Sequence, residues 1–225
     1  AVSADSWLAD GNYDISWYDE TKDEFSLSSP AQLAGLSYLV RAGKKFQYCT
    51  VRLSADIDLS NYKWIPIGTR GVEFKGLFDG GGHTISGLHT DMEVFSGLFG
   101  AVASTDIRNV MLSSSCVVVG SVAGSIAGSM NESAIMNCRS DAAVQGYTAG
   151  GLVGNSDNSS VLASIFNGRV SKLEASNAWV GSYTVTAGSP FEGEGTQSFE
   201  VTIEADDSSP ERLTIGWSSS RYGIV

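Results

Sequence analysis

One short motif recurs along the middle of the chain at nearly constant spacing. Gly97-Leu98-Phe99-Gly100 is echoed by Ser125-Ile126-Ala127-Gly128 and by Gly151-Leu152-Val153-Gly154. The closing glycines, at positions 100, 128 and 154, lie 28 and 26 residues apart. Periods of about 20 to 50 residues are typical of solenoids, propellers and arrays, in which each unit stacks on its neighbours.

A second motif advances by the same steps. Ile107-Arg108-Asn109-Val110, Ile135-Met136-Asn137-Cys138 and Val161-Leu162-Ala163-Ser164 begin 28 and 26 residues apart. Each unit holds short apolar runs without a helical pattern, which argues against leucine-rich and ankyrin repeats, and it is too short for a propeller blade. The repeat therefore predicts an all-β fold, a parallel β-helix with about five coils between Val51 and Ser171.

The repeat also predicts how the interior is filled. Glycines are expected where the chain turns a corner or where a side chain would collide with the next coil. Small and aliphatic side chains are expected to stack inside, namely Val117, Val119, Val122, Ile126, Leu152 and Val153.

The segments on either side of the repeats differ in character. Residues 1–24 indicate an irregular N-terminal arm, and residues 25–175 the β-helix. Within it, residues 29–43 predict a capping helix, with Ser29 as N-cap, Pro30 in the first turn and Gln32 completing a capping box. Because open coil ends are adhesive edges, we expect this helix to cover one of them. Residues 176–225 alternate like antiparallel strands and predict a small C-terminal β module or cap.

Composition narrows the classes of partner. With 42% apolar and 17% charged residues, the chain can bury a sizeable core. Its net charge of -11 argues against nucleic acid as a partner. The stretch from Asn109 to Asn131 contains no charged residue, but its serines make it too polar for a membrane span. The chain starts without an initiator Met or a leader, so we interpret it as a mature or trimmed chain.

The three cysteines, Cys49, Cys116 and Cys138, show no CxxC spacing, so neither a zinc ribbon nor a disulfide framework is expected. Each is expected to be a free, buried thiol. The alternative that stays open is a Cys116–Cys138 disulfide, which requires their Cα atoms to lie within about 7 Å on neighbouring coils.

Three segments together resemble the GLUG-motif family of bacterial surface proteins: residues 64–68 (WIPIG), residues 74–88 (FKGLFDGGGHTISGL) and residues 97–100 (GLFG). The resemblance extends from about Phe25 to Ser171. It implies a right-handed β-helix, export to the cell surface, and a role in adhesion or as a non-catalytic region of larger secreted proteins, including some peptidases. The chain departs from the pattern at Ser164, where many repeats have Asn-Cys, and at Gly124-Ser125, which replaces Gly-Gly.

Sequence motifs for chemistry are few. The chain has no GxSxG, phosphate loop, dinucleotide fingerprint or HExxH, and its only histidines are His83 and His89. We expect His83 to pin the Asp79-Gly80-Gly81-Gly82 turn through a hydrogen bond. No cofactor and no metal are expected.

The alternative to a non-catalytic module is a polysaccharide lyase or hydrolase, because such enzymes often use this fold. Three or more acidic side chains gathered in one cleft with a base would favour the enzyme. Acidic side chains that lie singly at corners of the coil would instead be solvated surface groups. The candidate acids are Asp56, Asp58, Asp79, Asp91, Glu93, Asp106 and Asp141. The candidate bases are Arg70, Arg108, Arg139 and Arg169.

Glycan binding usually relies on aromatic platforms, and between Gly100 and Ala178 the only aromatic residues are Tyr147 and Phe166. The end segments therefore hold the remaining candidates for sugar contacts, although packing at the ends explains them as well. These are Trp7, Trp17, Tyr18, Trp217 and Tyr222. The function expected from the sequence is a non-catalytic, extracellular scaffold or adhesion module that presents a rigid face to a protein or glycan.

Overall fold

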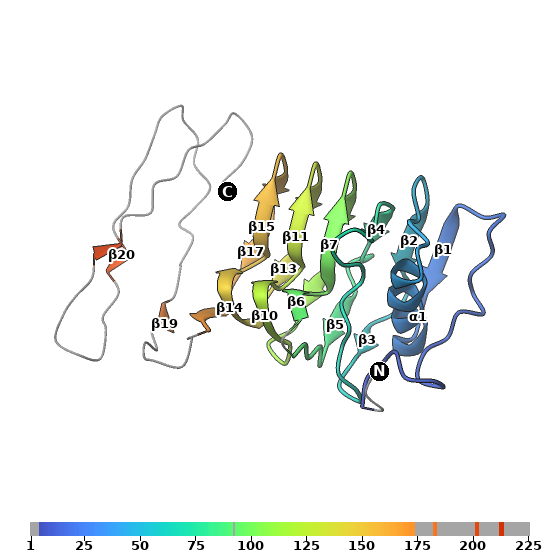
Figure 1. The fold of residues 1–225 in the computed structure, drawn as a ribbon, viewed down its shortest axis with the longest axis horizontal. Helices are drawn as coiled ribbons and strands as arrows, with labels where there is room; N and C mark the ends of the chain where they lie inside the picture. The colour runs from blue at the N-terminus through green and yellow to red at the C-terminus, as the bar shows by residue number, and fades with distance from the viewer. Residues whose placement is uncertain (1–4, 92, 174–181, 184–200, 203–211, 214–225) are drawn as a thin grey trace.

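The computed structural model describes residues 5–91, 93–173, 182–183, 201–202 and 212–213. They form the expected parallel β-helix, in which strands stack side by side along one axis (Figure 1). A complete coil passes through four sheets, here called I to IV in chain order, whereas the first coil contributes a strand to sheet I alone and the second to sheets I and II. Sheet I has six strands, one more than the expected number of coils, because a strand ahead of the helix adds a rung.

Within each sheet, the strands of successive coils pair in parallel. Sheet I contains β1 (Glu24–Leu27), β2 (Thr50–Leu53), β4 (Leu77–Asp79), β8 (Asp106–Arg108), β12 (Ala134–Met136) and β16 (Ser160–Leu162). Sheet II contains β3 (Ile57–Asp58), β5 (Thr84–Ser86), β9 (Met111–Leu112), β13 (Arg139–Ser140) and β17 (Ile165–Phe166). Sheet III contains β6 (Glu93–Ser96), β10 (Val117–Gly124), β14 (Ala143–Gly150) and β18 (Arg169–Lys172), and sheet IV contains β7 (Phe99–Ala103), β11 (Ala127–Asn131) and β15 (Val153–Asp157).

The C-terminal module predicted for residues 176–225 lies almost wholly outside the described residues. Three short strands are described there. β19 (Ser182–Tyr183) pairs antiparallel with β18, and β20 (Val201–Thr202) pairs antiparallel with β21 (Arg212–Leu213).

The glycine that closes each repeated motif is required by close approach of backbones. A Cβ atom would lie 2.4 Å from the Gly68 carbonyl oxygen if placed on Gly100, and 2.7 Å from the Ser96 nitrogen if placed on Gly128. On Gly154 it would lie 2.7 Å from the Gly128 carbonyl oxygen. All three distances are shorter than a non-bonded contact allows, which explains why glycine recurs at this point of the coil.

Two corners of the coil, on either side of the sheet I strands β8, β12 and β16, place non-glycine residues in the left-handed region. After the strand, Asn109, Asn137 and Ala163 have φ values of 55°, 51° and 47°. Before the strand, the same conformation recurs at Ser104, Glu132 and Asn158. Asparagine tolerates this conformation better than other non-glycine residues, so the recurring Asn of the second motif has a backbone role.

The change of repeat length from 28 to 26 residues arises at a single corner, between sheets II and III. Val117 follows Leu112 by five positions, whereas Ala143 follows the stacked residue Ser140 by three. The longer corner protrudes as the Ser113–Cys116 turn, closed by a hydrogen bond from the Cys116 amide to the Ser113 carbonyl. Strand register above and below this turn is undisturbed, because both neighbouring rungs pair in parallel.

The core changes in character along the axis. A column of rings runs through the N-terminal coils, with centroid separations of 5.7 Å from Phe25 to Phe46, 6.0 Å from Phe46 to Phe74 and 5.4 Å from Phe74 to Phe99. Towards the other end of the stack the interior is filled by smaller side chains such as Val144. The aromatic column makes the N-terminal half the larger apolar core.

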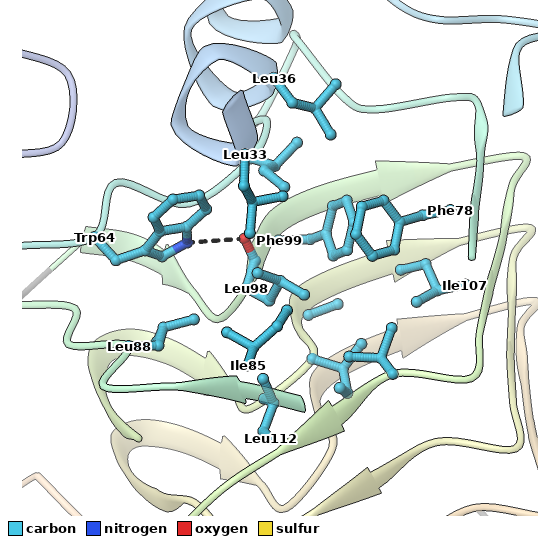
Figure 2. Packing of buried hydrophobic residues seen from close by; sticks show 14 of the residues in the cluster. Leu33, Leu36, Trp64, Phe78, Ile85, Leu88, Leu98, Phe99, Ile107 and Leu112 are labelled. Atoms are coloured by element: carbon cyan, nitrogen blue, oxygen red, sulfur yellow. Dashed lines mark hydrogen bonds between the residues drawn. The ribbon is translucent and has the colours of Figure 1, made fainter. Parts of the chain in front are cut away.

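The predicted helix is confirmed as α1 (Pro30–Arg41). The Ser29 hydroxyl accepts a hydrogen bond from the Gln32 amide, and Gly43 has a left-handed φ of 100° just beyond the last turn. The helix lies at the N-terminal end of the stack (Figure 1), where Leu33 and Leu36 face the core (Figure 2). Since β1 precedes it and β2 follows it, α1 forms part of the first coil.

One prediction about the interior was wrong. Val117, Val119 and Val122 are only half-buried and face outward, while Val118 is fully buried. Side chains along a strand alternate between inward and outward, and a run of valines fits either assignment. The sequence alone therefore could not determine which of them points inward. Ile126 is buried as expected, and Leu152 and Val153 are partly buried.

Candidate functional site

The outer face of sheet I carries two columns of side chains with a concave surface beside each. Side chains alternate along these short strands: Val51, Phe78 and Ile107 point inward, so the residues on either side of them point outward. One outward column includes Thr50, Leu77 and Asp106, and the other includes Arg52, Asp79 and Arg108. Successive side chains in a column are about 4.8 Å apart, the spacing between paired strands.

The larger concave surface, here called the arginine groove, lies at the corner between sheets I and II. Its volume is about 760 Å³, and it crosses five rungs, from β2 to β16 and β17. Its polar lining includes Arg52, Asp79, His83, Asn109, Asn137 and Arg139.

Asp79 is the central charge of this groove, and its side chain is only 7% exposed. One carboxylate oxygen lies 3.3 Å from an Arg52 Nη and 3.2 Å from the Arg108 Nε. The other accepts hydrogen bonds from the Asn109 side chain and the Gly81 amide, both at 2.9 Å. Every face of the carboxylate therefore has a partner, as a buried charge requires.

The pKa of Asp79 follows from these contacts. Burial raises it, but the hydrogen bonds from Asn109 and Gly81, together with the charges of Arg108 and Arg52, outweigh burial and hold the pKa below its usual value. Asp79 is consequently a permanent anion near neutral pH, which suits a structural role better than proton donation.

Asn109 and Asn137 continue the polar line along the groove. The Asn137 amide donates to the Asn109 side-chain oxygen at 2.7 Å, so Asp79, Asn109 and Asn137 form one chain of hydrogen bonds across three coils. Arg139 lies beyond, bound to Asp141 at 3.1 Å.

The second concave surface, here called the tyrosine cleft, lies at the corner between sheets IV and I. Its volume is about 410 Å³, and its lining includes Tyr48, Lys75, Ser104, Asp106 and Glu132. Tyr48 is 90% exposed, more than any other large apolar side chain among the described residues. Its only sign in the sequence is an aromatic pair, Phe46 and Tyr48, in the loop before β2.

The candidate acids are distributed over several surfaces. Asp79 and Asp106 lie in different concave surfaces, the other described acids lie apart, and the side chain of Glu93 is outside the described part of the molecule. In the described residues, neither concave surface gathers three of these acids with a base. Asp58 accepts from the Ser60 amide, Asp91 pairs with Lys63 at 2.7 Å, and Asp56 lies 3.3 Å from the His83 Nδ1.

The remaining candidates have mainly local contacts. His83 closes the preceding turn through its backbone, because its amide donates a hydrogen bond to the Gly80 carbonyl. Its side chain instead contacts Asp56 on the neighbouring coil. Arg108 belongs to the Asp79 column, whereas Arg70 and Arg169 are exposed.

The N-terminal aromatic residues that were candidates for sugar contacts are used in packing, the alternative that the sequence also offered. Trp7 is buried, with its indole nitrogen donating to the Leu59 carbonyl at 3.0 Å. Trp17 and Tyr18 pack around Phe25. The C-terminal candidates Trp217 and Tyr222 lie outside the described residues.

The cysteines are all free, which settles the open alternative for Cys116 and Cys138. Both are buried inside the coils, and Cys49 is half-buried beside Tyr48. Burial raises the pKa of all three thiols, to about 11 for Cys138. The described residues contain no group of three or more His, Cys, Asp or Glu side chains placed to hold a metal ion.

The fold and its surfaces define a β-solenoid with an exposed, grooved face. Comparison with protein-family models, curated proteins and solved structures found no match. In the described part of the chain, no helix combines the length and the apolar character needed to cross a membrane.

Proposed function

We propose that this chain is a non-catalytic scaffold or adhesion module of a bacterial cell surface, and that the outer face of sheet I is its binding face. The observation that carries the proposal is the arginine groove. Arg52 and Arg139 line it and Arg108 pairs with its central carboxylate, Asp79, although the net charge of the chain is -11.

The geometry supports binding more than catalysis. The groove is open and crosses five rungs, so it can contact an extended glycan or peptide at several points. Its buried carboxylate, Asp79, is committed to two arginines and to Asn109. Export to the cell surface and adhesion rest on the resemblance to the GLUG-motif family carried by residues 64–68, 74–88 and 97–100.

The experiment is a binding array of immobilised glycans and extracellular matrix proteins, probed with the wild-type chain and with Arg139→Gln. Arg139 lies in the groove, and its partner Asp141 is accessible to solvent, so the substitution should leave the fold intact. Arg70→Gln, an exposed arginine outside the groove, is the matched control. We expect binding that Arg139→Gln weakens and Arg70→Gln leaves unchanged.

The same glycans, incubated with the chain and analysed by mass spectrometry, separate this proposal from a polysaccharide lyase or hydrolase. Unchanged glycans are expected. Release of shorter or unsaturated products would contradict this proposal and show that the chain is an enzyme.

A further inference from the structure

Tyr48 combines two unfavourable features that folding alone does not explain. Its φ of 66° lies in the left-handed region, which is rare for a bulky side chain, and its ring is 90% exposed. Phe46, two residues earlier, has a similar φ of 55° but is buried in the aromatic column. Packing therefore explains the conformation of Phe46 but not that of Tyr48, and strained residues of this kind cluster at ligand sites.

Polar groups line the same cleft as Tyr48. The Lys75 ammonium and the Asp106 carboxylate line the same cleft, and within the described part of the chain neither forms an ion pair. Glu132 is oriented by a hydrogen bond from the Ser104 hydroxyl to one carboxylate oxygen, which leaves the second oxygen for a ligand. The cleft thus offers one flat apolar surface with hydrogen-bonding groups of both signs around it.

We propose that Tyr48 is a stacking platform for a sugar ring, with Lys75, Asp106 and Glu132 bonding its hydroxyl groups. A pyranose has a flat C–H face and a rim of hydroxyls, which match an aromatic face bordered by donors and acceptors. A protein ligand would favour a more apolar core at this position. The inference rests on the proposed function, because it names a glycan as the ligand of the sheet I face.

The test uses the full chain on an array of neutral, amino-containing and uronate-containing hexasaccharides. Tyr48→Ala should weaken binding to the glycans that the wild-type chain binds by about tenfold, the loss expected when a stacked aromatic ring is removed. Tyr48→Phe, which keeps the ring, should bind like the wild type. Tyr147→Ala, which removes an exposed tyrosine from sheet III, should also bind like the wild type.

Two further readouts separate a stacking role from a structural one. Tyr48→Gly should lose binding to the same extent as Tyr48→Ala, yet melt at a temperature at least as high as the wild type, because glycine tolerates a positive φ. The effect of Tyr48→Ala should persist in high salt, whereas the effect of Arg139→Gln should shrink, since salt screens charges and not stacking.

The outcomes distinguish the two proposals. Glycan binding that depends on Arg139 but not on Tyr48 would overturn the stacking site and leave the adhesion module standing. Binding to matrix proteins without any hexasaccharide would do the same. If the chain binds neither, both proposals fail.

Discussion

A single backbone conformation, repeated at equivalent corners, determines which residues the second motif can carry. Asn109 and Asn137 occupy the left-handed position on successive coils and bond to one another through their side chains. Ala163 occupies the same position on the next coil with a φ of 47° and has no polar side chain to extend the line. Alanine in this conformation costs about 1 kcal/mol relative to glycine.

Replacing Ala163 should therefore stabilise the protein. We expect Ala163→Gly to raise the free energy of unfolding by about 0.5 to 1 kcal/mol, because it removes the steric cost of the left-handed conformation. Ala163→Asn should act in the same direction and let the new amide donate to Asn137. Urea denaturation measures the change. Ala134→Gly, in strand β12, is the matched control and should destabilise; equal effects of the two glycine substitutions would contradict the explanation.

The buried thiols make the free energy of unfolding depend on pH in the alkaline range. Burial raises the pKa of Cys138 to about 11, so the folded state keeps its proton at pH values where an unfolded thiol, with a pKa of about 8.5, has lost it. The contribution of this difference is fully present below about pH 8.5 and is lost as the pH rises towards 11. We expect up to about 3 kcal/mol of destabilisation across this range from Cys138.

The measurement is the free energy of unfolding in urea at several pH values in that range. Cys138→Ala should show a shallower decline than the wild type, whatever its absolute stability. Parallel pH profiles for the two proteins would rule out Cys138 as a source of the alkaline sensitivity.

At the scale of elements, the parts of the fold that the sequence made predictable are those determined locally. The helix was predictable because Ser29, Pro30 and Gln32 form a start signal within four residues. The rungs were predictable because glycine recurs at one point of the coil where two backbones approach closely, as at Gly128. Neither inference requires knowledge of distant contacts.

The features of the candidate site that could not be predicted from the sequence depend on residues of neighbouring coils. Asp79 resembles any turn aspartate until stacking places Arg52 and Arg108 on its two sides. In the sequence Tyr48 resembles a core aromatic residue, but in the structure Phe46 of the same loop is buried and Tyr48 is exposed. The two halves of the candidate binding face therefore emerged only from the stacked structure.

The repeated glycines give the sharpest prediction at this scale. Gly128→Ala should destabilise the protein by about 3 kcal/mol, because the new methyl group would collide with backbone atoms of the preceding coil that cannot move independently. Gly71→Ala is the matched control, since its φ of 83° is strained for alanine but its Cβ would meet open space. It should cost about 1 kcal/mol. Thermal melting would test the ranking, and equal losses would show that strain, not collision, determines the requirement for glycine.

For the whole molecule, the uneven core predicts uneven stability along the axis. Stability in a solenoid is close to a sum of coils and their interfaces, so each region reflects its own packing. Phe78 and Phe99 are fully buried, whereas in the last described coil Val161 is half-buried and Ile165 is 53% exposed.

Hydrogen exchange followed by mass spectrometry should reveal this gradient. We expect amides of β4 and β8 to exchange most slowly and those of β16 and β17 to exchange fastest, because the C-terminal rungs open at a lower free-energy cost. Uniform protection from β4 to β17 would instead indicate that the solenoid unfolds as one cooperative unit.

The protruding turn at Ser113–Cys116 has a consequence for protein engineering. Neighbouring rungs keep their register although this corner is two positions longer than its counterpart at Ser140 and Ala143. Ser114 and Ser115 are exposed, so added chain would extend into solvent and leave the buried Cys116 in place. A foreign epitope spliced between these serines should be displayed on a rigid support, which makes the corner a natural point for loop grafting.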